Sequence, residues 1–172
     1  HYLGGSKDDY DVIKHRKSTV VSGNSRSYNA LIAATSKSLS NASALAAVEQ
    51  QLDITNFIDY MLLNFYVGNT DWSHQNWYSS FNRNNPEGRW RFHSWDAEHV
   101  LKGVNDNSVG KNNAASPTGF HQSLKRNEEY RTLFGDKIHQ HFFNNGVLTP
   151  EKAAASYQVR LDNIDEAIVA ES

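Results

Sequence analysis

One stretch of the chain, residues 54–65, has the spacing of a helix that is buried along a wide face. Its apolar side chains recur at intervals of three and four residues: Ile54, Phe57, Ile58, Met61, Leu62 and Phe65. Asp53 is suited to cap the start of this helix, and Gly68 to the left-handed position just beyond its end. Because so wide an apolar stripe must be covered by other elements, we expect this helix to lie at the centre of the fold.

The composition indicates one globular domain and excludes several classes of function. The chain has 172 residues, of which 38% are hydrophobic, and this is enough for a single domain with its own core. Its net charge of −2 provides no basic surface for nucleic acid or for an anionic membrane. The sequence contains no cysteine, which excludes disulfides and cysteine-based zinc sites, and no apolar run long enough to span a membrane. The oligomeric state stays open.

The segments on either side of the helix predict an α+β fold that is mostly helical. Aromatic and β-branched runs indicate four short strands, at residues 10–14, 19–21, 77–81 and 89–95. Periodic apolar residues and capping signals indicate four further helices, at residues 27–37, 40–51, 127–144 and from 149 onward. The last two strands form a small hairpin, and a long loop rich in Gly, Asn and Ser follows it over 102–119. The final helix is expected to turn four apolar side chains inward: Tyr157, Leu161, Ile164 and Ile168.

A polar loop follows the central helix directly and contains the first candidates for catalysis. It reads Asn69-Thr70-Asp71-Trp72-Ser73-His74-Gln75-Asn76. An irregular loop can turn Asp71 and Asn76 into one cleft, where a carboxylate can orient a nucleophile and an amide oxygen can bind Mg²⁺. Asn and Asp are also common in turns and caps, and that structural role explains the pair at least as well when it is taken alone.

A second carboxylate, Asp96, follows the last predicted strand and strengthens the hypothesis. Because side chains alternate along a strand, four residues are expected to share one face: Trp90, Phe92, Ser94 and Asp96. If Asp96 points into the cleft, Trp90 lines the same cleft, where its indole could stack on a purine. Ordinary core packing of Trp90 is an equal alternative.

Several neighbouring residues are weaker candidates. Glu98 could add a metal ligand, although an exposed loop acid is the simpler interpretation. His74 could contact a phosphate or a substrate hydroxyl, or only brace the loop. A zinc site is not expected, because the histidines lack a zinc-binding spacing and His139 and His141 lie on different faces of a helix.

Together these residues resemble the CotH family, named for the spore-coat protein H kinase of spore-forming bacteria. The resemblance rests on Asn69-Thr70-Asp71 with Asn76, and on the strand from Arg89-Trp90 to Trp95-Asp96. It implies an atypical protein-kinase-like fold that binds ATP and Mg²⁺ and transfers the γ-phosphate to Ser or Thr of a protein substrate. It also implies a role for each site residue: Asp71 is catalytic, Asn76 and Asp96 bind the metal, and Trp90 stacks on adenine.

The chain departs from a complete kinase in one respect. A kinase also needs a glycine-rich loop over the phosphates and a Lys on an N-terminal strand, and no such loop precedes residue 69. We therefore expect residues 1–172 to form the C-terminal lobe, a partial domain whose N-terminal lobe is missing and whose small hairpin carries the active-site loop. Such a fragment is expected to have little kinase activity by itself.

Two other functions fit the same residues. A relative could keep this fold as a non-catalytic spore-coat or surface binding module. An enzyme of this kind could also bind ATP reversed and transfer AMP instead of phosphate. The resemblance further suggests a bacterial, secreted protein at the cell or spore surface.

Overall fold

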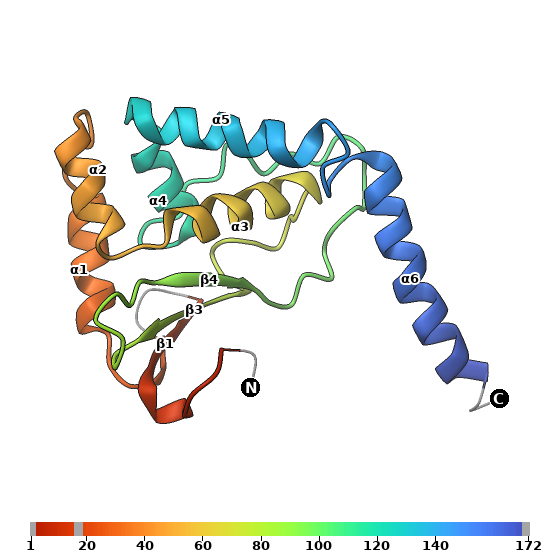
Figure 1. Ribbon diagram of the computed structural model, residues 1–172, viewed down its shortest axis with the longest axis horizontal. Coiled ribbons are helices and arrows are strands. Elements are labelled where there is room, and N and C mark those ends of the chain that lie inside the picture. The colour runs from red at the N-terminus through yellow and green to blue at the C-terminus, as the bar shows by residue number, and fades with distance from the viewer. Residues whose placement is uncertain (1–2, 16–18, 170–172) are drawn as a thin grey trace. The chain divides into compact units, whose positions relative to one another are not determined.

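In the computed structural model, the strands form a single antiparallel sheet (Figure 1). The structure describes residues 3–15 and 19–169. The strand order is β2-β1-β3-β4. The strand bounds are β1 Tyr10–Lys14, β2 Thr19–Ser22, β3 Trp77–Asn82 and β4 Arg91–Ser94. The α+β prediction is confirmed, but the expected small hairpin is only half of the sheet, because β1 pairs with β3 and brings β2 with it.

This pairing also decides which face of the sheet is turned toward the core. Ile13 lies opposite Ser79, and Ser79 lies opposite Phe92 on the next strand. Cross-strand partners share a face, and all three residues are buried. The helices begin and end as follows: α1 Arg26–Thr35, α2 Ala42–Glu49, α3 Ile54–Tyr66, α4 Pro117–Leu124, α5 Glu128–Phe142 and α6 Pro150–Val169.

Helix α3 is the central helix that the sequence predicts, and it packs against β4 (Figure 1). Asp53 caps it, with Oδ1 accepting a 2.9 Å hydrogen bond from the Asn56 backbone N–H, and Gly68 follows its end with φ +58°. The Asn56 amide also binds the edge of β4, accepting from the Phe92 N–H at 2.7 Å and donating to the Phe92 carbonyl at 3.4 Å. Helix and sheet are therefore joined by polar contacts as well as by apolar packing.

Two predictions about the C-terminal part of the chain need correction. The loop predicted over 102–119 ends earlier than expected, because helix α4 begins at Pro117, and its eight residues are too few for a clear apolar period. Ser116 and Pro117 are nevertheless a typical start signal. The apolar residues of α6 are not buried: Tyr157, Leu161, Ile164 and Ile168 are 64, 39, 53 and 60% exposed.

The division of the chain explains the exposed residues of α6. The chain forms two compact units, His1–Leu133 and Phe134–Ser172. Within the second unit, α6 is accompanied mainly by the end of α5, so that unit has too little of its own to cover an apolar helix face. No helix within the described residues is long and apolar enough to cross a membrane.

Candidate functional site

The loop after α3 is held at its start by buried polar contacts. Asn69 is 1% exposed, and its side-chain amide donates to Asn64 Oδ1 at 3.0 Å. The next residue, Thr70, donates both its backbone N–H and its hydroxyl to the His99 carbonyl, at 3.1 and 3.2 Å. The loop is therefore attached both to the helix it leaves and to the segment that follows β4.

Two backbone pairings bracket the predicted site residues. Thr70 binds His99 at one end, and Trp77 pairs with Ser94 at the other. Residues 71–76 and 95–98 fill the gap between these two pairings. The segment with Asp71 and Asn76 and the segment with Asp96 are therefore joined to each other at both ends, although these residues are 20 or more positions apart along the chain.

The Asp71 carboxylate is fixed by its own loop. Oδ1 accepts a hydrogen bond from Gln75 Nε2 at 2.8 Å and lies 3.5 Å from His74 Nε2, while Oδ2 accepts from Asn76 Nδ2 at 3.0 Å. The Asp71 side chain is 28% exposed and so remains accessible from solvent. The bond from Asn76 uses its amide nitrogen, which leaves the amide oxygen, the atom that binds cations, for another partner.

Asn76 and Asp96 share an unusual backbone conformation. Their φ angles are +57° and +51°, in the left-handed region that Asn and Asp tolerate better than most residues. Such conformations concentrate at functional sites, where the surrounding structure maintains them. Asp96 is exposed, and its carboxylate has no hydrogen-bond or ion-pair partner among the described residues, so its charge is available to a ligand.

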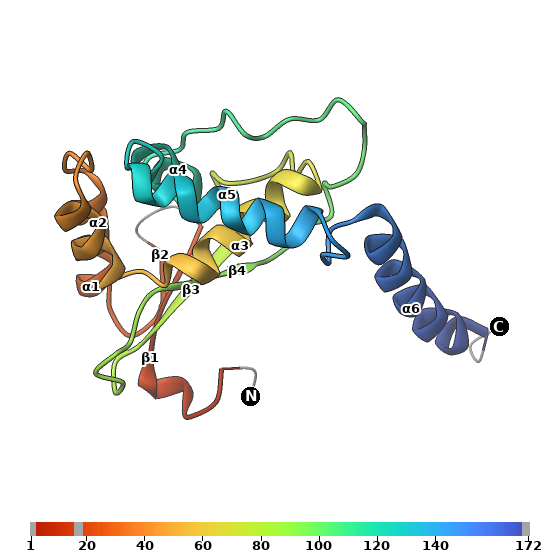
Figure 2. The same cartoon turned by 45° about the horizontal axis from the view of Figure 1, so that its top comes forward.

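Lys111 connects the long loop between β4 and α4 (green in Figure 2) to the candidate site. Its ammonium group donates to the carbonyls of Thr70, at 2.5 Å, of Asn69, at 3.4 Å, and of Trp72. Partial burial lowers the pKa of Lys111, and the negative charge of Asp71 acts in the opposite direction. One cation thus orients the backbone on both sides of Asp71.

Replacing Lys111 by Met is expected to loosen this loop. Three carbonyls lose a charged donor, and a hydrogen bond to a charged group contributes on the order of 1–3 kcal/mol. We expect faster amide hydrogen exchange in residues 69–73 and a reduced free energy of unfolding, with little change for the exposed Lys37→Met. Unchanged exchange at residues 69–73 would contradict this role.

A buried cluster of hydroxyl groups anchors the middle of the loop on the start of α4. Ser73 Oγ lies 2.6 Å from Thr118 Oγ1 and 3.0 Å from Ser116 Oγ. All three residues are at most 4% exposed. The sequence indicated neither this anchor nor Lys111, because both depend on packing of the long loop that no local pattern determines.

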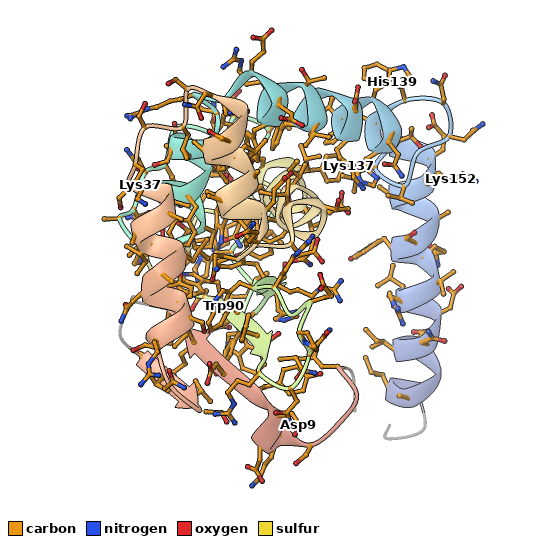
Figure 3. The ribbon with its side chains drawn as sticks, turned by 60° about the vertical axis from the view of Figure 1, so that its left-hand side comes forward. Asp9, Lys37, Trp90, Lys137, His139 and Lys152 are labelled. Atoms are coloured by element: carbon orange, nitrogen blue, oxygen red, sulfur yellow. The ribbon has the colours of Figure 1, made fainter. Side chains whose placement is uncertain are left out.

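Trp90 does not line an open cleft, and the prediction that its ring faces a purine there is wrong for this structure. The residue is 0% exposed and lies among packed side chains (Figure 3). Its ring centroid is 5.0 Å from that of Tyr28, in an edge-to-face contact, and 5.6 Å from that of Phe81. The structure therefore supports the alternative, core packing.

The remaining acids and histidines add few possible metal ligands to the candidate site. Within the described ranges, no three His, Asp or Glu side chains are grouped so that they could hold a metal. Glu98 is exposed and lies 3.6 Å from His99. A cation at this site would therefore rely on Asn76 and Asp96, with Asp71 nearby, and this hard oxygen set suits Mg²⁺ bound together with phosphates.

Comparison with known protein families identifies the family to which this chain belongs. The family model described as "CotH kinase protein" matches residues 2–171. The chain belongs to the CotH family. No curated protein and no solved structure matches it. Membership of CotH indicates a kinase-like function, and with it the use of a nucleotide and a metal in general terms.

Proposed function

We propose that this CotH chain is the C-terminal lobe of a protein kinase that transfers the γ-phosphate of ATP to Ser or Thr of a protein substrate. The observation that carries the proposal is the gap between the Thr70–His99 and Trp77–Ser94 pairings. Asp71 and Asn76 lie on one of the two segments between these pairings and Asp96 lies on the other, and an acid, an amide and a second acid are the groups that phosphoryl transfer requires.

Each residue has a definite part in the reaction. Asp71, held by Gln75 and Asn76, orients the substrate hydroxyl and accepts its proton. Asn76, through its amide oxygen, and Asp96, through its unpaired carboxylate, would hold Mg²⁺, which would supply positive charge to neutralise the phosphates. Lys111 keeps the backbone around Asp71 in place. We further propose that the protein acts outside the cell or at a spore or cell surface.

Transfer of label distinguishes this function from the others that fit the family. The chain is incubated with Mg²⁺, a Ser- and Thr-rich protein, and ATP labelled at either the γ- or the α-phosphate. We expect slow transfer of the γ label that Asp71→Asn removes. Transfer of the α label would instead show an AMP-transferring enzyme, and Mg²⁺-dependent ATP binding with no transfer of either label would favour a binding module.

A further inference from the structure

Helix α6, Pro150–Val169, carries an apolar stripe with the spacing of a coiled coil. Its members recur at alternating intervals of three and four positions: Ala154, Tyr157, Leu161, Ile164 and Ile168. In the seven-residue notation abcdefg, they occupy positions a and d in turn. All of them are exposed. A stripe with this spacing is suited to pack against another helix, because the a and d side chains of both helices then meet along one seam.

The surface of α6 also has a groove of the kind that receives a side chain from a facing helix. The groove has a volume of about 320 Å³, and its described lining residues all belong to α6. Four of them have the spacing i, i+3, i+4 and i+7: Leu161, Ile164, Asp165 and Ile168. In a coiled coil, four residues of one helix form the hole into which an apolar side chain of the other helix inserts.

The charged residues beside the stripe are complementary between two parallel copies of α6. Arg160 occupies position g, and Asp165 occupies position e of the next heptad. In a parallel two-stranded coiled coil, side chains at these two positions on opposite helices form salt bridges. Both residues are exposed, and neither has a hydrogen-bond or ion-pair partner among the described residues. A symmetric pair of copies would form this contact twice.

We propose that α6 pairs, parallel and in register, with α6 of a second copy of this chain. A second copy provides the same apolar stripe and the opposite charge at each flanking position, as a two-fold symmetric interface requires. Ile164 of each copy, at a d position, inserts into the groove of the other. Pairing also covers apolar side chains that are exposed in the compact unit Phe134–Ser172. The inference is independent of the proposed function.

Sedimentation velocity of the whole chain over a range of concentrations tests the pairing. Because only two heptads take part, we expect a reversible dimer with a Kd of roughly 10–500 μM. Ile164→Asp places a charge in the stripe and should raise this Kd by about tenfold or more. Val159→Asp is the control, because Val159 is 57% exposed on the same helix but lies at position f, away from the stripe. The control should dimerise as the unmodified chain does.

A chain that stays monomeric up to about 1 mM would overturn the proposal. The stripe would then be covered by another part of its own chain or by a different protein. Equal weakening by Ile164→Asp and Val159→Asp would also contradict it, because the dimer would then not use the a and d positions.

A single introduced cysteine tests the direction of the pair, because the chain has no cysteine of its own. In a parallel pair Ala154 lies beside its counterpart, so Ala154→Cys should form a disulfide between copies rapidly under mild oxidation. In an antiparallel pair centred on Leu161, the two cysteines would be roughly 20 Å apart, too far for a disulfide. Val159→Cys, outside the stripe, should cross-link only slowly. Equal cross-linking rates of the two variants would contradict the parallel arrangement.

Discussion

Asp96→Asn is expected to remove Mg²⁺-dependent nucleotide binding and to leave the free protein as stable as before. The substitution keeps the shape of the side chain and takes away the charge that would bind the cation. Because Asp96 is exposed and has no hydrogen-bond or ion-pair partner among the described residues, its charge makes no local contact that the substitution could break. An Asn is also well tolerated at its φ of +51°.

A thermal-shift titration with ATP, with and without Mg²⁺, measures this effect. Ligand at 100 times its Kd adds about 2.7 kcal/mol to the stability of the folded state. For a chain of this size that raises Tm by roughly 5–10 °C. We expect this rise for the unmodified chain and for Glu98→Gln, a nearby exposed acid, and its loss in Asp96→Asn. Equal responses of Asp96→Asn and the unmodified chain would show that Asp96 holds no metal.

Trp90→Ala is expected to cause the largest loss of stability of any single change considered. Removing a large, fully buried aromatic side chain costs about 3–5 kcal/mol, from lost burial and from the cavity left behind. The edge-to-face contact with Tyr28 is lost as well. Trp95→Ala removes the same type of side chain from a 56% exposed position and should change the stability by no more than about 0.5 kcal/mol.

Urea unfolding of the two variants compares these positions directly. A Trp90→Ala protein that unfolds at a much lower urea concentration than Trp95→Ala would agree with a core role for Trp90. The reverse order would mean that Trp90 is not part of the core. A Trp90→Ala protein that stays as stable as the unmodified chain but binds ATP more weakly would instead support Trp90 as the stacking residue.

The error over Trp90 shows where a local pattern stops being informative. Alternation along the strand correctly grouped Trp90 with Phe92, and both are buried. It failed at Asp96, because β4 ends at Ser94 and the backbone of Asp96 is left-handed, so the alternation no longer applies there. The direction of the Asp96 side chain therefore gives no information about which face of β4 Trp90 occupies.

Other parts of the fold could be predicted where they depend only on residues that are close together in the sequence. The central helix, its Asp53 cap and Gly68 at its end follow from spacing and from the chemistry of single residues. The pairing of β1 with β3 joins segments more than 60 positions apart, and no local signal specifies it. The hydrogen bonds from Lys111 to the backbone around Asp71 likewise depend on the course of a long loop. The candidate residues could thus be found from the sequence, but not the contacts that hold them.

The most direct test of the central claim uses Mn²⁺ as a paramagnetic substitute for Mg²⁺. Mn²⁺ with ATP is added to isotopically labelled protein, and line broadening is recorded for each backbone amide. We predict that broadening is strongest around Asp71, Asn76 and Asp96 and fades away from the gap between Thr70–His99 and Trp77–Ser94. Strong broadening elsewhere, with these three residues unaffected, would contradict a nucleotide–metal site at this position.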